Sequence, residues 1–291
     1  MGTDLASKFA ASGFRVTAFG RPGGTSETFL NRVSRSAEEL GVKLDSGAIE
    51  LCADSSRIDW SSVDLVNENV SEDLGTKKLV FHQIVKLAKG DTLITSNSST
   101  FGISEISKGL SNPKRFFGLH FFMPAHLVPL VEIILSEKSD RLWADHLKQE
   151  LTGAGFTPVV VRKDIPGFLA NRIQAAMMRE VWHLLENDVA SAEDLDKAVV
   201  NGFGCRLLAA GPVMQKEISG LDITYAANKN VFRHLSNATE PPGVLADKIS
   251  SGNLGMKTGK GFWNWNESSS SKVRKKYIDQ LKAAINLISL K

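Results

Sequence analysis

Cysteine is scarce in this sequence of 291 residues, which contains only Cys52 and Cys205. Two isolated cysteines argue against a disulfide framework and against a clustered metal site, and they favour a reducing compartment. No stretch reaches the roughly 18 consecutive apolar residues of a membrane span, and the N-terminus lacks the basic and apolar regions of a signal peptide. We therefore expect a cytoplasmic protein without a membrane span or a bound metal.

The sequence also has no large excess of positive or negative charge. The 35 lysines and arginines against 32 aspartates and glutamates leave a formal net charge of +3, and the basic residues are scattered. Only VRKKY, residues 273–277, is locally basic, and a solvated helix face explains it better than a nucleic-acid patch. The expected partner is a small-molecule substrate, rather than a nucleic acid or a membrane.

Short apolar runs alternate with helical patterns over the first 162 residues. Such runs, rich in β-branched and aromatic residues, are typical of strands. Strands that alternate with helices predict a mostly parallel, doubly wound sheet, so we expect a Rossmann-like α/β domain over residues 1–162. The expected strands are FRVTAF (14–19), AIELCA (48–53), VDLVNE (63–68), TLITSN (92–97), RFFGLHFF (115–122) and TPVVVR (157–162).

The remaining residues, 163–291, have helical periodicity and few β-branched runs. Pro166 and Gly167 precede a long helical pattern, and Ser191 with the acids that follow it is a helix-capping signal. ESSSSK, residues 267–272, is expected to be a polar linker before a last amphipathic helix. Because a chain of this length usually exceeds one core, we expect a separate all-α domain over residues 163–291.

The N-terminal segment indicates a dinucleotide-binding unit whose beginning is absent. A helical pattern at 3–13 leads into the strand at 14–19, but the strand and the glycine-rich turn that normally precede that helix have no counterpart. Gly2 corresponds to the third glycine of G-x-G-x-x-G. We expect a domain that is N-terminally incomplete in this chain and binds dinucleotide poorly, and a start assigned at an internal methionine is the simpler explanation.

The end of the strand at 14–19 bears on the choice of cofactor. Where an acid that holds the ribose is expected, the sequence has Gly20 followed by Arg21. An arginine in place of the acid favours the 2′-phosphate of NADP, although Arg21 is equally well a surface-loop residue. The expected cofactor is therefore NAD or NADP.

Five motifs follow one another along the chain: DLVNENVSEDLGTKK (64–78), SNSSTFGISEIS (96–107), GLHFFMPAHLVPLVE (118–132), KDIPGFLANRI (163–173) and GMKTGKGFWNW (255–265). In this order they resemble the motifs of the 3-hydroxyacyl-CoA dehydrogenase family, over most of the chain. The resemblance implies an oxidoreductase that interconverts a 3-hydroxyacyl-CoA and its 3-oxo form by hydride transfer to NAD or NADP. It also implies a place in fatty acid metabolism and a homodimer.

The resemblance further implies roles for single residues. It makes His120 the catalytic general base and Glu132 the partner that orients it. It assigns contacts with the substrate to Ser99 and Asn171. The other matched residues are implied to lie near the cofactor: Gly2, Glu72, Lys77 and Asn97.

The chemistry of these side chains agrees with such roles. When hydride leaves a secondary alcohol, a proton remains on the oxygen, and the neutral imidazole of His120 can accept this proton near pH 7. Glu132 can fix the tautomer of His120. Each residue also has a structural interpretation. His120 is then a hydrogen-bonded core histidine, Ser99 a cap, and Asn171 bonded within its helix. His126 matches no functional position and is expected to be structural.

Two positions bear on the substrate. Met123 replaces the asparagine of the family's H-F-F-N-P, so the fit of the substrate is expected to differ. Parts of the sequence also resemble the family's branch that acts on free hydroxy acids, which includes carnitine and gulonate dehydrogenases and lambda-crystallin, and Arg206 matches an arginine of that branch. A guanidinium can hold a free carboxylate with two hydrogen bonds, whereas Arg206 is otherwise an ordinary helix-end charge.

Three functions follow from these observations. The first is a 3-hydroxyacyl-CoA dehydrogenase with His120 as its base. The second is a dehydrogenase of a free 3-hydroxy acid, whose carboxylate Arg206 binds. The third is a structural or binding protein that has lost catalysis, which the absent phosphate-binding turn suggests.

Overall fold

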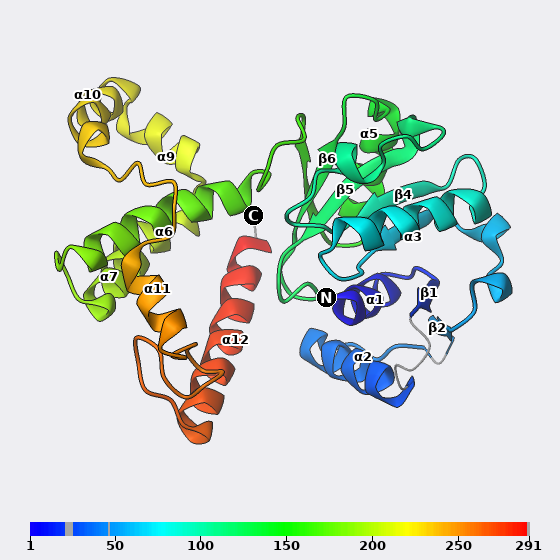
Figure 1. Cartoon of the computed structure of the whole chain (residues 1–291), viewed down its shortest axis with the longest axis horizontal. Helices are drawn as coiled ribbons and strands as arrows, with labels where there is room; N and C mark the ends of the chain where they lie inside the picture. The colour runs from blue at the N-terminus through cyan, green and yellow to red at the C-terminus, as the bar shows by residue number, and fades with distance from the viewer. Residues whose placement is uncertain (21–25, 46, 290–291) are drawn as a thin grey trace. The chain divides into compact units, whose positions relative to one another are not determined.

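The computed structural model describes residues 1–20, 26–45 and 47–289. The chain divides into two units, Met1–Arg172 and Ile173–Lys291 (Figure 1). Segment 163–172 belongs to the first unit because Phe168 packs into that unit's core. The domain boundary expected between residues 162 and 163 stays a prediction.

The first unit contains parallel strands between helices, which confirms the predicted α/β, doubly wound fold. Neighbouring strands of its larger sheet are parallel except β5 and β6, which are antiparallel. The sheet has the order β3 (Leu65–Glu68), β4 (Leu93–Ser96), β5 (Phe116–Phe121), β6 (Leu130–Leu135) and β7 (Thr157–Val161). A separate parallel pair is formed by β1 (Val16–Phe19) and β2 (Ile49–Cys52).

The interruption between the two sheets falls where the sequence lacks a strand. In the usual doubly wound order, 3-2-1-4, the first strand lies between the second and the fourth. Here β1 and β2 take the places of the second and third strands, and β3 takes that of the fourth. Over the residues that the structure describes, β1 and β3 are not joined through hydrogen bonds into one sheet, as the absent first strand predicts.

One strand, β6, was not predicted from the sequence. Five of its six residues, Val131 to Leu135, are buried, so both faces are covered and the apolar–polar alternation of a half-exposed strand is absent. It follows β5 through segment 122–129 and returns antiparallel to it. This return places residue 132 opposite residue 120.

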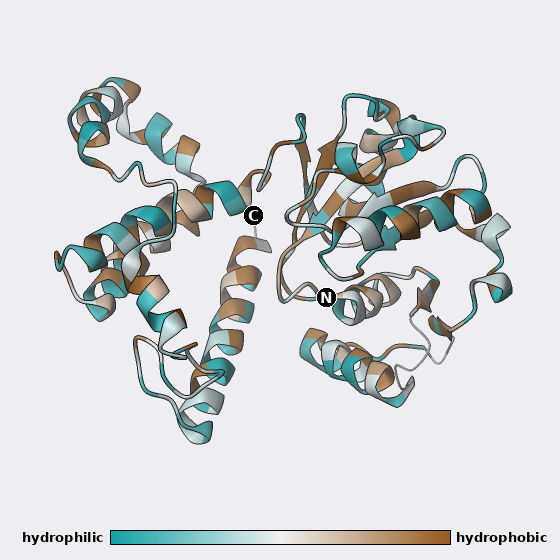
Figure 2. Cartoon of the chain, in the orientation of Figure 1, coloured by the Kyte–Doolittle hydropathy of each residue, from teal (hydrophilic) through white to brown (hydrophobic). Residues whose placement is uncertain are grey.

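Two hydrophobic clusters cover the two faces of the larger sheet. One joins α1 (Gly2–Ala11) and α5 (Arg141–Gly153) to the inward side chains of β5 and β6, such as Leu119 and Ile133. The other joins α3 (Leu74–Leu87) and α4 (Ile103–Ile106) to the opposite face, and Phe168 is part of it. Figure 2 shows β4, between these layers, as a largely hydrophobic strand.

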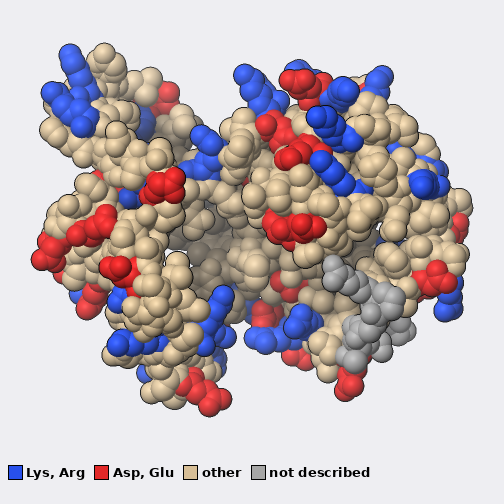
Figure 3. Space-filling model, viewed as in Figure 1, with Lys and Arg blue, Asp and Glu red and all other residues tan. Residues whose placement is uncertain are grey.

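α2, Ser26–Leu40, packs on α1 through polar contacts as well. The Ser7 hydroxyl donates to the Val33 carbonyl oxygen at 3.1 Å, and the Ser36 hydroxyl donates to Asp4 at 3.2 Å. Short 3₁₀ helices occur at Ser55–Arg57, Trp60–Ser62 and Pro113–Arg115. Charges of both signs are interspersed over the face of the chain in Figure 3, in keeping with the small net charge.

The second unit is helical over its described residues, as predicted, apart from two isolated β-bridges near residue 260. Its helices are α6 (Ala170–Glu186, which begins in the first unit), α7 (Ala192–Ala198), a π-helix (Val199–Gly204), α8 (Cys205–Leu207), α9 (Pro212–Ser219), α10 (Leu221–Val231), a 3₁₀ helix (Phe232–His234), α11 (Gly243–Ser250) and α12 (Glu267–Ser289).

The polar linker expected at residues 267–272 is wrong, because these residues form the first turns of α12. Asn266 precedes the helix, and its side-chain oxygen accepts the Ser269 backbone N–H at 2.8 Å. The Ser269 hydroxyl in turn accepts the Asn266 backbone N–H at 3.0 Å. This reciprocal cap satisfies N–H groups at the helix start, so the serine run begins a helix.

Candidate active site

His120 and Glu132 form a pair across two strands. They occupy directly opposite positions of the antiparallel strands β5 and β6, so their side chains leave the same face of the sheet. The His120 Nδ1 lies 2.8 Å from the Glu132 Oε2, and the two residues are 4% and 0% exposed. With Glu132 ionised, Nδ1 carries the proton and donates it, which leaves Nε2 as the basic nitrogen.

The second carboxylate oxygen of Glu132 holds the start of α6. Glu132 Oε1 accepts the backbone N–H groups of Leu169 and Ala170, both at 2.9 Å. The first N–H groups of a helix have no acceptor within the helix, and a carboxylate at this end is favoured by the helix dipole. Burial opposes the ionisation of Glu132, but the bonds from His120 and from these two N–H groups lower its pKa overall. The carboxylate is therefore an anion with both oxygens engaged.

Two aromatic rings enclose the histidine. Phe122 lies edge-on to the His120 ring at 4.6 Å between centroids, and Phe168 lies at 5.3 Å. Phe168 is 2% exposed and has a left-handed backbone with φ of 48°. A phenylalanine in that region is held there by its surroundings, since the conformation is unfavourable for a residue with a Cβ atom. The rings give His120 an apolar environment.

Asn97 connects the end of β4 to the strand of the histidine. Its side-chain oxygen accepts the Phe121 backbone N–H at 2.9 Å, and its amide nitrogen donates to the Asn69 side-chain oxygen at 2.8 Å. Asn97 is therefore next to His120 through the backbone of Phe121. Ser99, two residues further on, is exposed. The hydroxyl that caps this turn belongs instead to Ser98, which accepts the Phe101 N–H at 2.9 Å.

Gly2 lies at the same end of the sheet. It is the first residue of α1, and a Cβ atom placed on it would lie 3.7 Å from the Asn69 Cβ. Because the N–H groups at a helix start attract phosphate, this position fits the diphosphate of a dinucleotide. Gly2, Asn69, Asn97 and the dyad thus lie along one edge of the first unit. Arg21, the other predicted cofactor residue at the N-terminus, lies outside the described residues.

Lys77 and Glu72 are close together but differ in access to solvent. The Lys77 side chain is 1% exposed, and its Nζ lies 3.0 Å from Glu68 Oε1 and 3.2 Å from Glu72 Oε2. The Glu72 side chain is 37% exposed. Only Glu72 of these two predicted cofactor residues therefore has a substantial surface facing solvent.

The two remaining predicted residues belong to helices. Asn171 is half-buried and directly follows Ala170, which is bonded to Glu132, so it lies at the start of α6 near the dyad. Arg206 is exposed in α8 of the second unit. Of the predicted residues in the first unit, the structure brings those that it describes to one region. Arg206 belongs to the second unit.

Glu68 and Phe168 were missed as site residues by the sequence reasoning. Glu68 stands inside the motif DLVNE, nine positions before Lys77, and an acid at the end of an apolar strand is a signal for a buried ion pair. Phe168 follows Gly167 in the motif KDIPGF, and nothing in the sequence alone shows that its ring reaches His120.

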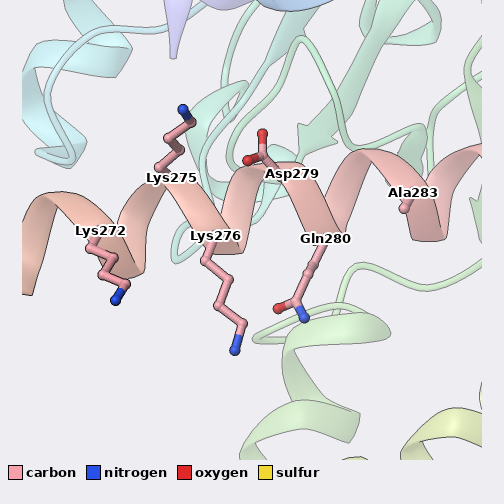
Figure 4. A pocket seen from close by; sticks show the side chains of 6 residues that line it. All are labelled: Lys272, Lys275, Lys276, Asp279, Gln280 and Ala283. Carbon is pink, nitrogen blue, oxygen red and sulfur yellow. The ribbon is translucent and has the colours of Figure 1, made fainter.

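Other classes of site find no support among the described residues. They contain no group of three or more histidines, cysteines, aspartates and glutamates placed to hold a metal ion. Within the same ranges, none of the helices has the length and apolar character needed to cross a membrane. Figure 4 shows a shallow hollow whose lining residues all belong to α12, with Lys275 and Asp279 pointing one way and Lys272, Lys276 and Gln280 another. These side chains do not converge on a ligand.

Comparison with known proteins points to one family. The chain matches the sequence models of the 3-hydroxyacyl-CoA dehydrogenase NAD binding domain over residues 1–165 and C-terminal domain over residues 167–265. It is 31% identical over 268 residues to 5-formyl-3-hydroxy-2-methylpyridine 4-carboxylate 5-dehydrogenase of Mesorhizobium japonicum, which covers 90% of this chain and 87% of that protein. It is 30% identical to L-carnitine dehydrogenase of Oceanobacillus iheyensis, over 76% of this chain and 73% of that protein.

A solved structure has a similar fold over nearly the whole chain. It is a 5-formyl-3-hydroxy-2-methylpyridine 4-carboxylic acid 5-dehydrogenase, described as an NAD+-dependent dismutase. The TM-score is 0.92 at 29% sequence identity, and the match covers 99% of this chain and 95% of that one.

Proposed function

The chain belongs to the 3-hydroxyacyl-CoA dehydrogenase family, and on that basis we propose that it oxidises a secondary hydroxyl group, or reduces the matching carbonyl, with His120 as the general base. The observation that carries this proposal is the buried pair of His120 and Glu132, bonded at 2.8 Å on facing strands. NAD or NADP, when bound, supplies the hydride acceptor, as in the family's NAD binding domain.

His120 performs the proton transfer. Its Nε2 accepts the hydroxyl proton as hydride leaves the carbon, and it returns a proton to the carbonyl oxygen in the reverse direction. Glu132 stabilises the imidazolium that forms and keeps Nδ1 protonated in both states. Phe122 and Phe168 limit the access of water to the ring.

The substrate oxygen needs hydrogen-bond donors as it becomes a carbonyl. The Ser99 hydroxyl and the Asn171 amide are the donors that we propose, because Ser99 is exposed beside Asn97 and Asn171 follows the segment bonded to Glu132. Gly2, Glu72 and Asn97 are proposed to lie along the cofactor. Arg21 remains a proposed determinant of NADP use.

Two substrate classes are candidates. A 3-hydroxyacyl-CoA agrees with the family's name and would give the protein a place in fatty acid metabolism. A free hydroxy-substituted carboxylate is favoured by the two relatives described above, both of which act on small carboxylates according to their names. We propose the free acid as the substrate, with Arg206 bound to its carboxylate. Nothing in the comparisons supports a protein that has lost catalysis.

A substrate panel tests this choice. Purified protein would be assayed with 3-hydroxybutyryl-CoA, L-carnitine and L-gulonate, each with NAD and with NADP. We expect turnover of a free acid and a raised KM for that acid in Arg206→Met, with little change in the KM for the cofactor. Activity on the thioester alone would reject the free acid and the role of Arg206. Activity on none of the substrates, in protein shown to bind NADH, would argue against the dehydrogenase itself.

We also propose a homodimer that forms through the second unit and works in the cytoplasm. Apolar side chains are widely exposed on α9 and α10, among them Val213 at 75%, Ile218 at 76% and Ile223 at 64%. An exposed apolar surface of this kind commonly marks an interface between subunits. Light scattering coupled to gel filtration would give twice the chain's 31.7 kDa for the dimer. A mass of a single chain at assay concentration would exclude it.

A further inference from the structure

Glu68, the last residue of β3, is a buried carboxylate that connects three elements. Its side chain is fully buried, and its two oxygens lie 3.0 and 3.2 Å from the Lys77 Nζ of α3. It also accepts the Ser96 hydroxyl at the end of β4, at 2.6 Å, and the Val70 backbone N–H at 2.5 Å. Burying an anion is costly unless such donors surround it, so this arrangement is maintained against a substantial desolvation cost.

Lys77 links Glu68 to a second carboxylate. Its Nζ lies 3.2 Å from Glu72 Oε2, and Glu72 Oε1 accepts the Ser98 hydroxyl at 2.5 Å and the Thr100 backbone N–H at 2.9 Å. We refer to Glu68, Lys77 and Glu72 as the charged triad, in which Glu68 and Lys77 are buried and Glu72 is partly exposed. One cation between two anions leaves a net negative charge, which the O–H and N–H donors stabilise.

The charged triad fixes the loop that follows β4, residues 97–101. The Asn97 N–H donates to the Glu68 carbonyl oxygen at 2.9 Å, and the Ser98 N–H donates to the Ser96 hydroxyl at 3.2 Å. The Thr100 N–H donates to Glu72. The loop backbone is therefore held by the triad residues and by a serine bonded to them.

This loop carries two of the residues proposed for the reaction. Asn97 is bonded to the Phe121 N–H beside His120, and Ser99 is the proposed donor to the substrate oxygen. A shift of the triad would therefore change the distance between Ser99 and His120. Catalytic rates are sensitive to such displacements, since a misplacement of about 1 Å can reduce a rate about 10²-fold.

We propose that Glu68 is a positioning residue for the dehydrogenase reaction: through Ser96, and through Lys77 and Glu72, it sets the loop of residues 97–101 against His120. Lys77 acts through the same carboxylates, and its side chain is 1% exposed between them. This inference rests on the proposed function.

A double-mutant cycle tests the proposal in the full chain. The variants are Glu68→Gln, Lys77→Met and the two combined, and the measurements are kcat, the Kd of NADH by fluorescence titration, and Tm. The combined variant leaves no uncompensated buried charge from this pair, so its Tm is expected to stay near that of the wild type. We expect kcat to fall at least about 10-fold in both single variants and no further in the combined one, since the residues act as a unit.

A matched control lies just beyond the other ends of the same strand and helix. Lys89, after α3, and Asp64, before β3, form an exposed ion pair at 3.1 Å at the opposite end of these elements. Lys89→Met is expected to keep the kcat of the wild type.

The outcomes separate the possibilities. A combined variant with the kcat of the wild type would show that the triad only stabilises the fold, which overturns the proposal. A raised NADH Kd with an unchanged kcat in both single variants would assign the triad to cofactor binding alone, which also overturns the proposal. If the combined variant does not fold, Ser96→Ala provides the test, because it removes only the hydroxyl that is bonded to Glu68. A several-fold lower kcat in Ser96→Ala supports the proposal, and an unchanged kcat rejects it. Wild-type protein without activity on any substrate would instead reject the proposed function.

Discussion

Replacing Glu132 with glutamine should change the tautomer of His120 while leaving the shape of the site intact. Glu132 Oε1 accepts the N–H groups of Leu169 and Ala170, so the oxygen of a glutamine would have to face these two donors. The glutamine NH₂ would then face His120 Nδ1, where it can only donate. Nδ1 would become an acceptor, the proton would move to Nε2, and His120 could no longer accept a proton from the substrate.

The size of the effect can be worked out from this geometry. The opposite orientation of the amide would set its NH₂ against two N–H donors, so the unproductive tautomer is the favoured one. In a serine protease, the equivalent exchange of the orienting carboxylate lowers kcat about 10⁴-fold with the geometry intact. We expect kcat of Glu132→Gln to fall by about 10³ to 10⁴, or roughly 4 to 5.5 kcal/mol in the barrier.

The assay is steady-state NADH formation, with Tm recorded for each variant. Loss of the charge weakens the bonds to His120 and to α6, so a destabilisation of about 1.5 to 3 kcal/mol is expected in a protein that remains folded. Glu39→Gln is the matched control, because Glu39 lies 2.7 Å from the Nε2 of another buried histidine, His126. It should leave kcat within about 2-fold of the wild type. Glu132→Gln with more than a tenth of the activity of the wild type would refute the reasoning.

Two further predictions concern stability. Burial lowers the pKa of His126, but the carboxylates of Asp4, 3.7 Å from Nδ1, and Glu39, 2.7 Å from Nε2, raise that pKa overall. A histidine whose pKa is raised in the folded state stabilises the fold below its unfolded pKa of about 6.5, and this stabilisation is lost as pH rises through the folded pKa. The difference in Tm between the wild type and His126→Gln, measured by calorimetry, should therefore shrink from about pH 5 to about pH 9. A difference in Tm that does not change with pH would contradict this. In Gly118→Ala, the new Cβ would lie 2.8 Å from the Ile134 Cβ. Urea unfolding should show a loss of about 1 to 3 kcal/mol, and an unchanged midpoint would mean that Ile134 moves freely.

The family and the α/β fold could be predicted because they depend on patterns along the chain. Alternating apolar runs and helical segments correctly indicate the doubly wound sheet, and ordered motifs correctly indicate the family. Strand β6 was missed because five of its six residues are buried, so LVEIIL has no alternation that separates it from a buried helix turn. The pairing of His120 with Glu132 was expected from the sequence, but the antiparallel register that sets the two residues opposite each other was not.

The solvent exposure and the hydrogen-bond partners of single side chains could not be predicted. Lysines are almost always exposed, so nothing in the sequence showed that Lys77 would be 1% exposed between two carboxylates. Within SNSST, any of three serines could cap the turn, and the structure assigns that contact to Ser98. Such outcomes depend on the packing of β3, β4 and α3 against each other, which no local pattern encodes.

The rate of hydride transfer in His120→Asn tests the central claim most directly. Asparagine keeps a polar side chain of similar size but cannot accept the proton, and loss of general base catalysis typically costs about 10² to 10⁴ in rate. The single-turnover rate of NADH formation should fall by that factor, while the Kd of NADH stays within about 2-fold of the wild type. A rate within ten-fold of the wild type, in folded protein with normal NADH binding, would contradict the assignment of His120 as the base.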